Sequence, residues 1–341
     1  MKKHRIALIG LGMAVTPHAK SLLDLADRVE VAAAYSRSAP RRSDFAARFA
    51  FPTTGDLEAI IADASIDAAL VLTPPRTHLP LVEHLAAAGK HVLLEKPVEA
   101  DTARAEAVVE ACERAGVALG IVFQQRFQPA ARLISDKIRN GELGEIAAAS
   151  VTARWWRPQS YYDQAGRGTV ERDGGGVLMT QAIHILDLLL TLTPPVVEVV
   201  AFAGTSMLHR METEDIAVGA LRFANGALGS VDASTAIFPG FPERLEIIGT
   251  LGTAVFARGK ADVYFRDGRR ETLGDELPVG LVADPMAFPN DAHRALLGEF
   301  LDALDAGRSP TNSGRDALKV HYLIDALLAS SRNASVAAVH S

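Results

Sequence analysis

One histidine stands in surroundings that suit proton transfer. His184 lies in the stretch GGGVLMTQAIHILD (174–187), where three glycines lead into an apolar helix. Thr180 and Asp187 share a helix face with His184, because residues three and four apart are neighbours on a helix surface. A polar stripe on an otherwise apolar helix is typical of a helix that faces a cleft. The alternative is a buried histidine that is hydrogen-bonded to a backbone carbonyl.

Lys96 is the second candidate for acid–base chemistry. It ends a predicted strand, HVLLEK (91–96), and precedes Pro97, which disfavours the helical conformation at Lys96 and holds it extended. A lysine held in a partly desolvated cleft loses basicity and can exchange protons near neutral pH. The alternative is a solvated surface lysine, which the neighbouring Glu95 and Pro97 make less favourable.

These side chains need a scaffold, and the first third of the chain alternates strands with helices. This order predicts an α/β fold, a Rossmann-type doubly wound parallel sheet with helices on both faces. Ligands bind in such folds at the carboxyl ends of the strands. The predicted strands cover residues 5–10, 29–35, 67–73, 91–96 and 117–123.

A glycine turn after the first strand predicts a dinucleotide site. Gly10-Leu-Gly12 precedes a helix that we expect to begin at Thr16 (N-cap) and Pro17. A pyrophosphate rests at such a turn on backbone N–H groups and the helix N-terminus. Val15 replaces the third glycine of the usual fingerprint, and a purely structural turn is the alternative. The predicted cofactor residues at the turn are Gly10, Gly12, Met13 and Ala14.

The end of the second strand bears on the choice of dinucleotide. NAD sites place a carboxylate there for the ribose hydroxyl, whereas this chain has Ser36 and Arg37, followed by Arg41 and Arg42. A hydroxyl and a guanidinium suit a 2′-phosphate, so we expect NADP(H) to be favoured over NAD(H). An exposed basic loop is the alternative. Further predicted cofactor contacts follow later strands, at Thr73, Pro74, His78, Glu95 and Lys96.

Several of these stretches together resemble the Gfo/Idh/MocA oxidoreductase family. They are Gly10-x-Gly12, TPPRTH (73–78), GKHVLLEKP (89–97) and GGGVLMTQAIHILD, and the resemblance runs through nearly the whole chain. It implies a Rossmann domain followed by an α/β domain whose open, mostly antiparallel sheet mediates dimers or tetramers. It also implies oxidation or reduction of a ring carbon of a sugar, sugar derivative or cyclitol.

The resemblance implies catalytic roles for Lys96 and His184 beside the reacting oxygen. Many members carry an acid four residues before this histidine, where this chain has Thr180. A hydroxyl cannot hold a negative charge or act as a base at neutral pH, so a two-residue relay of Lys96 and His184 is expected. The predicted substrate-binding residues are Arg126, Arg157, Tyr161, Arg167, Thr180 and Gln181.

The second half reads as consecutive strands with turns at Asn225-Gly226 and Asp267-Gly268, which favours a largely antiparallel sheet. Two helices, at 290–306 and 314–331, close the chain. The expected domains are therefore a Rossmann NAD(P)-binding domain over 1–123 and a C-terminal α/β domain over 124–341 for substrate binding and oligomerisation.

Composition limits the partners. A net charge of −6 argues against a nucleic-acid surface or polybasic membrane contact, and a single cysteine, Cys112, excludes an internal disulfide. We expect a cytoplasmic homodimer or homotetramer without a metal site. Two alternatives to the dehydrogenase remain open: a non-catalytic cofactor-binding regulator, and a hydrolase or epimerase that uses tightly bound NAD transiently.

Overall fold

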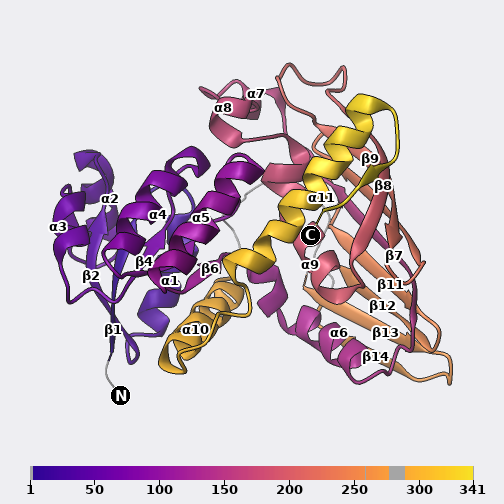
Figure 1. Cartoon of the computed structure of the whole chain (residues 1–341), viewed down its shortest axis with the longest axis horizontal. Helices are drawn as coiled ribbons and strands as arrows, with labels where there is room; N and C mark the ends of the chain where they lie inside the picture. Colours follow the sequence, from indigo (N-terminus) through magenta and orange to yellow (C-terminus); the bar gives the residue numbers. More distant parts are fainter. Residues whose placement is uncertain (1–2, 258, 276–288, 341) are drawn as a thin grey trace. The chain divides into compact units, whose positions relative to one another are not determined.

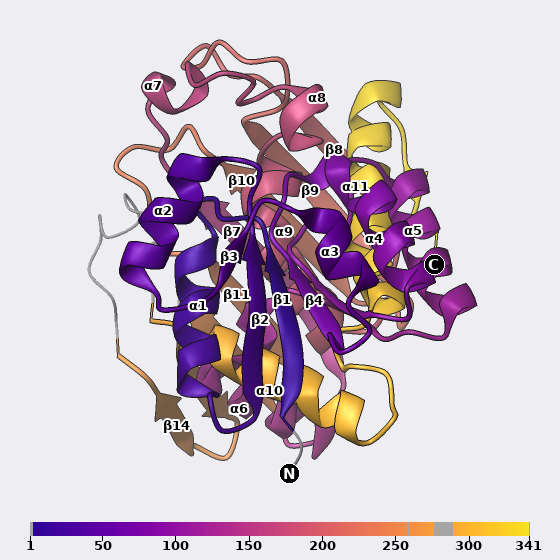
Figure 2. The same cartoon turned by 90° about the vertical axis from the view of Figure 1, so that its left-hand side faces the viewer.

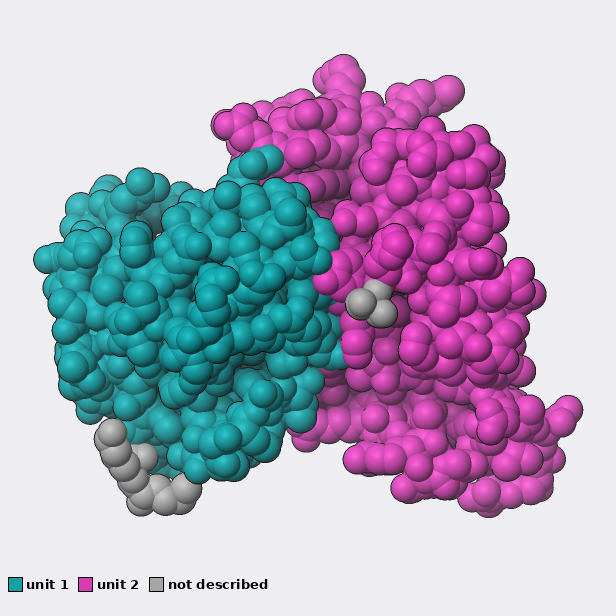
Figure 3. Space-filling view, in the orientation of Figure 1, with its two compact units in different colours: residues 1–124, 286–318 teal, residues 125–285, 319–341 magenta. Residues whose placement is uncertain are grey.

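The computed structural model describes residues 3–257, 259–275 and 289–340. The chain forms two compact units, drawn in teal and magenta in Figure 3. Unit 1 comprises Met1–Gln124 and Met286–Leu318, and unit 2 comprises Gln125–Pro285 and Lys319–Ser341. This division differs from the expected domains, because the chain returns to the first unit after leaving it. The helix over Asp291–Asp305 packs against the first helix of the chain.

Unit 1 is built on a six-stranded parallel sheet, which confirms the predicted Rossmann-type fold. The strand order is β3-β2-β1-β4-β5-β6, and Figure 2 shows β2, β1 and β4 side by side. The central strand β1 is almost inaccessible to solvent from Ile6 to Ile9, as expected for a strand covered on both faces. The strands are β1 (His4–Ile9), β2 (Val29–Tyr35), β3 (Thr53–Thr54), β4 (Ala68–Val71), β5 (His91–Leu94) and β6 (Leu119–Ile121).

Helices connect these parallel strands, because a parallel pair requires a crossover connection. Aspartates at Asp56 and Asp101 cap two of the helices by accepting hydrogen bonds from backbone N–H groups. The helices of unit 1 are α1 (Val15–Asp24), α2 (Ala39–Arg48), α3 (Leu57–Ala62), α4 (His78–Ala87), α5 (Thr102–Ala115) and α10 (Asp291–Asp305), with a short 3₁₀ turn over Pro75–Thr77.

Unit 2 contains a nine-stranded sheet in the order β14-β13-β12-β11-β7-β10-β9-β8-β15. Neighbouring strands are antiparallel except β7 and β10, which run parallel. This confirms the predicted open, mostly antiparallel sheet. The strands are β7 (Ile146–Arg154), β8 (Val196–Gly204), β9 (Ile216–Phe223), β10 (Leu228–Ser234), β11 (Arg244–Gly249), β12 (Gly252–Ala257), β13 (Lys260–Phe265), β14 (Arg270–Leu273) and β15 (Ala337–Ala338).

Helices cover one face of this sheet. Figure 1 shows α6, α9 and the C-terminal part of α11 on that face, and α9 packs on β7 and β11. Along β9 the side chains alternate between buried and exposed, as a sheet with one solvated face requires. The helices are α6 (Pro129–Arg139), α7 (Gln159–Tyr162), α8 (Val170–Asp173), a π-helical turn η3 (Leu178–Ala182), α9 (Ile183–Leu192) and α11 (Gly314–Asn333), and a 3₁₀ turn over Gln124–Phe127 precedes α6.

One helical stretch among the described residues, Val170–Leu192, is long and apolar enough to cross a membrane. Buried residues make up 78% of its apolar window. Its contacts with β7 and β11 show where this apolar surface goes, since a hydrophobic helix needs a partner to exclude water. The stretch is a core helix of unit 2.

Candidate active site

The turn after β1 has little room at one glycine and open space at the other. Gly10 has φ +108°, and a Cβ there would lie 2.8 Å from the backbone C and O of Leu72. Only glycine therefore suits this position. At Gly12 an added Cβ would meet no atom within 4 Å. The second glycine leaves space beside the backbone, as the approach of a ligand requires.

Helix α1 begins with its N-terminus uncapped by side chains. It starts at Val15, earlier than the predicted start at Thr16 and Pro17, because the missing N–H of a proline is tolerated within the first turn. Ala14 provides no side-chain cap, and the first turn has no acidic residue. Such an end attracts anions through its N–H groups and the helix dipole. Met13, 63% exposed, lies at the same turn.

At the end of β2 one arginine is held by the protein and another is exposed. The Arg42 guanidinium donates to the carbonyl of Ser36 (Nη1 to O, 2.6 Å) and packs close to Gly55. Ser36 is buried, whereas Arg37 is exposed. Ser38 caps α2 by accepting from the backbone N–H of Arg41. The segment from Tyr35 to Ser38 carries no carboxylate.

His78 fixes the conformation of the turn after β4. The imidazole is fully buried, and its Nε2 and Nδ1 lie 2.8 Å and 3.0 Å from the carbonyl oxygens of Thr73 and Val98. Burial lowers the pKa of His78, against the opposing effect of its two hydrogen bonds. Both ring nitrogens are thus used inside unit 1. The side chain joins the turn at Thr73 and Pro74 to the segment that follows Lys96.

Glu95 lies in a cluster of titratable groups beside Lys96. His18 Nε2 is 3.6 Å from a carboxylate oxygen of Glu95, and the rings of His18 and His293 meet edge to face at 4.9 Å. Burial works to raise the pKa of Glu95, but the His18 contact and the Lys96 charge hold it below its usual value. Burial lowers the pKa of His293 to about 3. His18 and His293 were not expected to meet, because 275 positions separate them and no motif joins them.

The segment that leads to His184 departs from regular α-helix. The π-helical turn η3 directly precedes α9, in which His184 is the second residue. Such turns occur mostly inside α-helices and frequently at functional sites. His184 is partly exposed, whereas Ile183 and Ile185 are fully buried. The helix therefore directs one polar side chain out of an apolar core.

Glu214 caps this helix from another part of unit 2. Its carboxylate accepts from the N–H groups of Gly176 (3.1 Å) and Leu178 (3.2 Å), and its carbonyl accepts from Val177 (2.8 Å). A Cβ at Gly176 would lie 1.9 Å from the Glu214 carbonyl oxygen, so only glycine fits. Burial raises the pKa of Glu214, and the neighbouring Asp215 charge adds to the rise. Sequence reasoning missed Glu214, because nothing in the motif points to a residue 38 positions later.

The polar residues around His184 have internal partners. The Thr180 hydroxyl donates to the carbonyl of Gly176 at 2.6 Å and also contacts the side-chain oxygen of Gln181, which is buried. Asp187, 2% exposed, forms a two-point ion pair with Arg126 (Nε to Oδ2, 2.6 Å). The Arg126 guanidinium, expected to bind substrate, is thus held by a carboxylate on the helix of His184.

Three of the expected substrate residues lie together in unit 2. The guanidinium carbons of Arg157 and Arg167 lie 5.5 Å and 5.0 Å from the centre of the Tyr161 ring. Arg157 also lies over Trp155, at 5.3 Å. Burial lowers the pKa of Arg157, and the like charge of Arg167 acts in the same direction. The guanidinium groups of Arg157 and Arg167 therefore both lie near the phenol ring of Tyr161.

A buried histidine holds the backbone of this cluster. His209 Nδ1 lies 2.7 Å from Asp215 Oδ2, and His209 Nε2 lies 2.8 Å from the Arg157 carbonyl. Both partners are hydrogen-bond acceptors. Asp215 is fully buried and also accepts from Ser206. No motif in the sequence predicts these contacts of His209.

The predicted site residues thus fall into two sets. One set lies at the carboxyl ends of the parallel strands of unit 1 and includes Gly12, Ser36 and Lys96, while the other lies around α9 and the end of β7. In the part of the chain that the structure describes, no group of three His, Cys, Asp or Glu side chains is placed to hold a metal ion.

Comparison with known proteins agrees with this arrangement. Residues 4–123 match the model of an oxidoreductase family with an NAD-binding Rossmann fold, and residues 131–255 match the GFO/IDH/MocA C-terminal domain. A myo-inositol 2-dehydrogenase of Thermotoga maritima is 29% identical over 92% of this chain and 91% of its own length. A D-apiose dehydrogenase of Paraburkholderia graminis is 28% identical over 97% of this chain and 88% of its own.

Among solved structures, the WlbA dehydrogenase of Bordetella pertussis in complex with NADH and UDP-GlcNAcA is similar over 100% of this chain and 99% of that one. The identity is 28% and the TM-score is 0.87. The open turn at Gly12 and the uncapped start of α1 are the features that a bound dinucleotide needs. The chain belongs to the Gfo/Idh/MocA family and is an NAD(P)-dependent oxidoreductase that acts on CH–OH groups.

Proposed function

We propose that this protein oxidises or reduces a ring carbon of a sugar, sugar derivative or cyclitol. The observation that carries the proposal is the open, uncapped N-terminus of α1 beside Gly12, at the sheet edge where Lys96 follows β5. A nicotinamide dinucleotide fits this end of the sheet and would accept or supply the hydride. The relatives named for myo-inositol and D-apiose support polyhydroxylated substrates.

The chain's own residues then supply proton transfer and orientation. Lys96 Nζ takes the proton of the substrate hydroxyl during oxidation and returns it during reduction, and His184 assists at the same oxygen. Thr180 takes no part as a base, because its hydroxyl donates to its own helix. Glu95 holds negative charge next to Lys96. Arg126 orients α9 through Asp187.

Replacement of Lys96 by methionine tests this role. We expect kcat to fall about 100-fold or more, since a positioned acid–base group contributes about 10²–10⁴-fold. Cofactor affinity, measured by fluorescence titration, should change little. Arg114→Gln, on the exposed side of α5, is the matched control for loss of a cation in unit 1. Full turnover by the Lys96→Met variant on an identified substrate would remove the proposed role.

We further propose that NADP(H) is preferred over NAD(H). The support is the absence of a carboxylate between Tyr35 and Ser38 together with the exposed Arg37. A 2′-phosphate would receive a charge-assisted hydrogen bond from Arg37. We expect Arg37→Gln to weaken NADP binding about 10-fold and to leave NAD binding unchanged. Tighter binding of NAD than of NADP by the wild type would contradict the preference.

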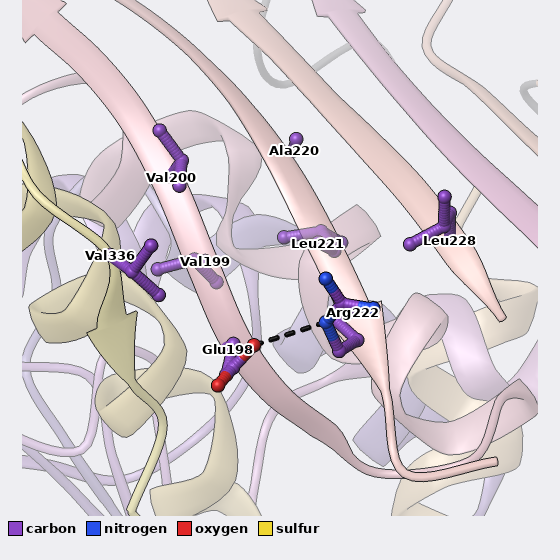
Figure 4. A pocket seen from close by; sticks show the side chains of 8 residues that line it. All are labelled: Glu198, Val199, Val200, Ala220, Leu221, Arg222, Leu228 and Val336. Carbon is purple, nitrogen blue, oxygen red and sulfur yellow. Dashed lines mark hydrogen bonds and ion pairs between the residues drawn. The ribbon is translucent and has the colours of Figure 1, made fainter. Parts of the chain in front are cut away.

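The free face of the unit 2 sheet is the proposed surface for a homodimer or homotetramer. Figure 4 shows a groove across β8 and β9 that is lined by Val200 and, farther along the strands, by the Glu198–Arg222 ion pair of 3.0 Å. Phe202 is 73% exposed and Val218 is 48% exposed on the same strands. An apolar sheet face of this kind is typical of a protein interface.

Substitution on this face tests the assembly. Phe202→Glu should convert the oligomer to a monomer in light scattering coupled to size exclusion, because a charge would enter an apolar interface. Leu208→Glu, at an exposed position of unit 2 outside the sheet, is the control for a new charge. A wild-type monomer at micromolar concentration would contradict the proposal.

A further inference from the structure

We propose that Arg157, Tyr161 and Arg167 form a subsite for a carboxylate of the substrate, so that the preferred substrate is an acidic sugar rather than a neutral one. This inference rests on the proposed function, because it assigns the substrate class of the same site. The relevant contacts all lie within unit 2.

The cluster concentrates positive charge in a place with little solvent. Arg157 is 6% exposed and the Arg167 side chain 16% exposed, and both guanidinium groups lie close to the Tyr161 ring. Arg167 Nε is buried and has no hydrogen-bond partner among the described residues. A buried donor of this kind costs free energy unless a ligand satisfies it. The donor and the nearby like charge both favour an anion.

The nearby acid does not balance the cations. Asp173 lies 3.4 Å from Arg167 Nη1 and 3.8 Å from Arg172 Nε, so one carboxylate serves two arginines. Asp173 also accepts from the backbone N–H of Gly168 at 2.8 Å. The long Asp173–Arg167 contact leaves the guanidinium able to take a second carboxylate. Planar guanidinium groups bind carboxylates through two parallel hydrogen bonds, which is the geometry that a uronate group offers.

The subsite is held rigidly and is connected to the helix of His184. His209 binds the Arg157 carbonyl and Asp215 binds His209, with both contacts under 3 Å. The residue before Asp215 is Glu214, which caps the helix leading to His184. This chain of buried contacts fixes the charged subsite relative to α9. A carboxylate bound there would position the ring of the substrate at a set distance from His184.

Matched pairs of sugars test the proposal. D-glucuronate and D-galacturonate are compared with D-glucose and D-galactose, with D-glucose 6-phosphate as a third probe and both cofactors present. We expect the uronates to have the higher kcat/KM in the wild type. Arg167→Gln should raise KM for the uronates about 10- to 100-fold with kcat little changed, because a group remote from the reacting carbon contributes uniform binding. The neutral sugars should change less than about 3-fold.

Two further variants keep the test interpretable. Arg157→Lys retains the charge but loses the planar fork, and it should reduce the uronate preference in part. Arg154→Gln, whose arginine pairs with Asp232 on the sheet, is the matched control and should leave every rate unchanged. Thermal unfolding of each variant identifies any loss of folding. If Arg167→Gln fails to fold, the Arg157→Lys result carries the decision.

A binding measurement separates this inference from the proposed function. The chain has two tryptophans, Trp155 and Trp156, and Arg157 stacks over Trp155. Uronate should therefore change the intrinsic fluorescence of the wild type but not of Arg167→Gln, whether or not turnover occurs. Equal kcat/KM for uronates and neutral sugars, or preference for the phosphate ester, would overturn the carboxylate subsite and leave the oxidoreductase proposal standing. Fluorescence binding without turnover of any sugar would overturn the proposed function alone.

Discussion

Two helices of this protein begin after glycines, one in each unit, and their N-termini are satisfied in opposite ways. Helix α1 follows Gly12 with no side-chain cap and no acid in its first turn. The helical segment after Gly176 receives the carboxylate of Glu214. A helix N-terminus attracts an anion in either case. In unit 2 the protein provides that anion, whereas in unit 1 we propose that the cofactor provides it.

The space around the two glycines reflects this difference. Nothing lies within 4 Å of a Cβ built at Gly12, but the Glu214 backbone lies 1.9 Å from a Cβ built at Gly176. One glycine keeps room for a ligand and the other lets two parts of the chain meet. A glycine before a helix therefore leaves open space beside the backbone in unit 1, whereas in unit 2 it allows two segments of the chain to pack closely.

The largest expected effect is that of Gly176→Ala. The new methyl group would overlap the Glu214 carbonyl, which belongs to the backbone and cannot turn away, so the free energy of unfolding should fall by about 3 kcal/mol or more. Chemical denaturation of the purified variant measures this loss. Gly204→Ala, where an added Cβ meets nothing within 4 Å, is the control in the same unit. Wild-type stability of Gly176→Ala would show that the two segments separate easily.

Gly12→Ala should have the opposite combination of effects, with little change in stability and a large loss of cofactor affinity. We expect the free energy of unfolding to stay within about 0.5 kcal/mol, because the site is open. The affinity for the dinucleotide should fall about 10- to 100-fold, equivalent to about 1.4–2.8 kcal/mol. Calorimetric titration with NAD and NADP measures the affinity. Gly10→Ala, with its positive φ, should instead lose stability, and unchanged cofactor binding by Gly12→Ala would contradict the comparison.

Ala14→Asp converts the start of α1 into an end that already carries an acid. The carboxylate should stabilise the helix by about 0.3–1 kcal/mol through the dipole, and it should weaken dinucleotide binding about 10-fold by charge repulsion. Thermal unfolding and cofactor titration measure the two effects. Ala14→Asn is the control, since it can cap without charge. Tighter cofactor binding by the aspartate variant would argue against an anion site at this turn.

Glu214→Gln should give the smallest effect, seen in the pH dependence of stability. Burial raises the pKa of Glu214, so its contribution is fully present below about pH 4.5 and is lost as the pH rises through the raised value. The Glu214→Gln variant has no carboxyl group at this position, so it does not lose stability in this way as the pH rises. The difference in melting temperature between variant and wild type should therefore change with pH across that range, in favour of the variant as the pH rises. Two melting curves that run parallel at every pH would contradict the prediction.

Much of the architecture was predictable from the sequence. The order of strands and helices gave the parallel sheet, and the predicted strand over 29–35 coincides with β2. The run of strands after residue 145 gave the mostly antiparallel sheet. Periodicity and turn residues act locally, so they appear in the sequence itself. The return of α10 to unit 1 was not predictable, because it depends on a contact with α1 more than 260 positions away.

The candidate site was likewise predictable only in part. Its residue types and their place after particular strands or glycines follow from the sequence, and they include Lys96, His184 and the absence of an acid at Thr180. The contacts that hold the site residues in place could not be predicted from the sequence. His78 joins two carbonyls, Asp187 holds Arg126, and His209 links Asp215 to Arg157.

The sequence by itself determined that glycines precede these two helical segments and that Lys96 and His184 stand in stretches that resemble those of the Gfo/Idh/MocA family. Only the tertiary structure decided which helix end stays open, because that depends on whether an acid distant in sequence fills it. Glu214 lies 38 positions after Gly176, and among the described residues no carboxylate is hydrogen-bonded to the start of α1 in this way. Local residue patterns fix conformation within a few residues, whereas capping, burial and charge pairing depend on which segments meet in three dimensions.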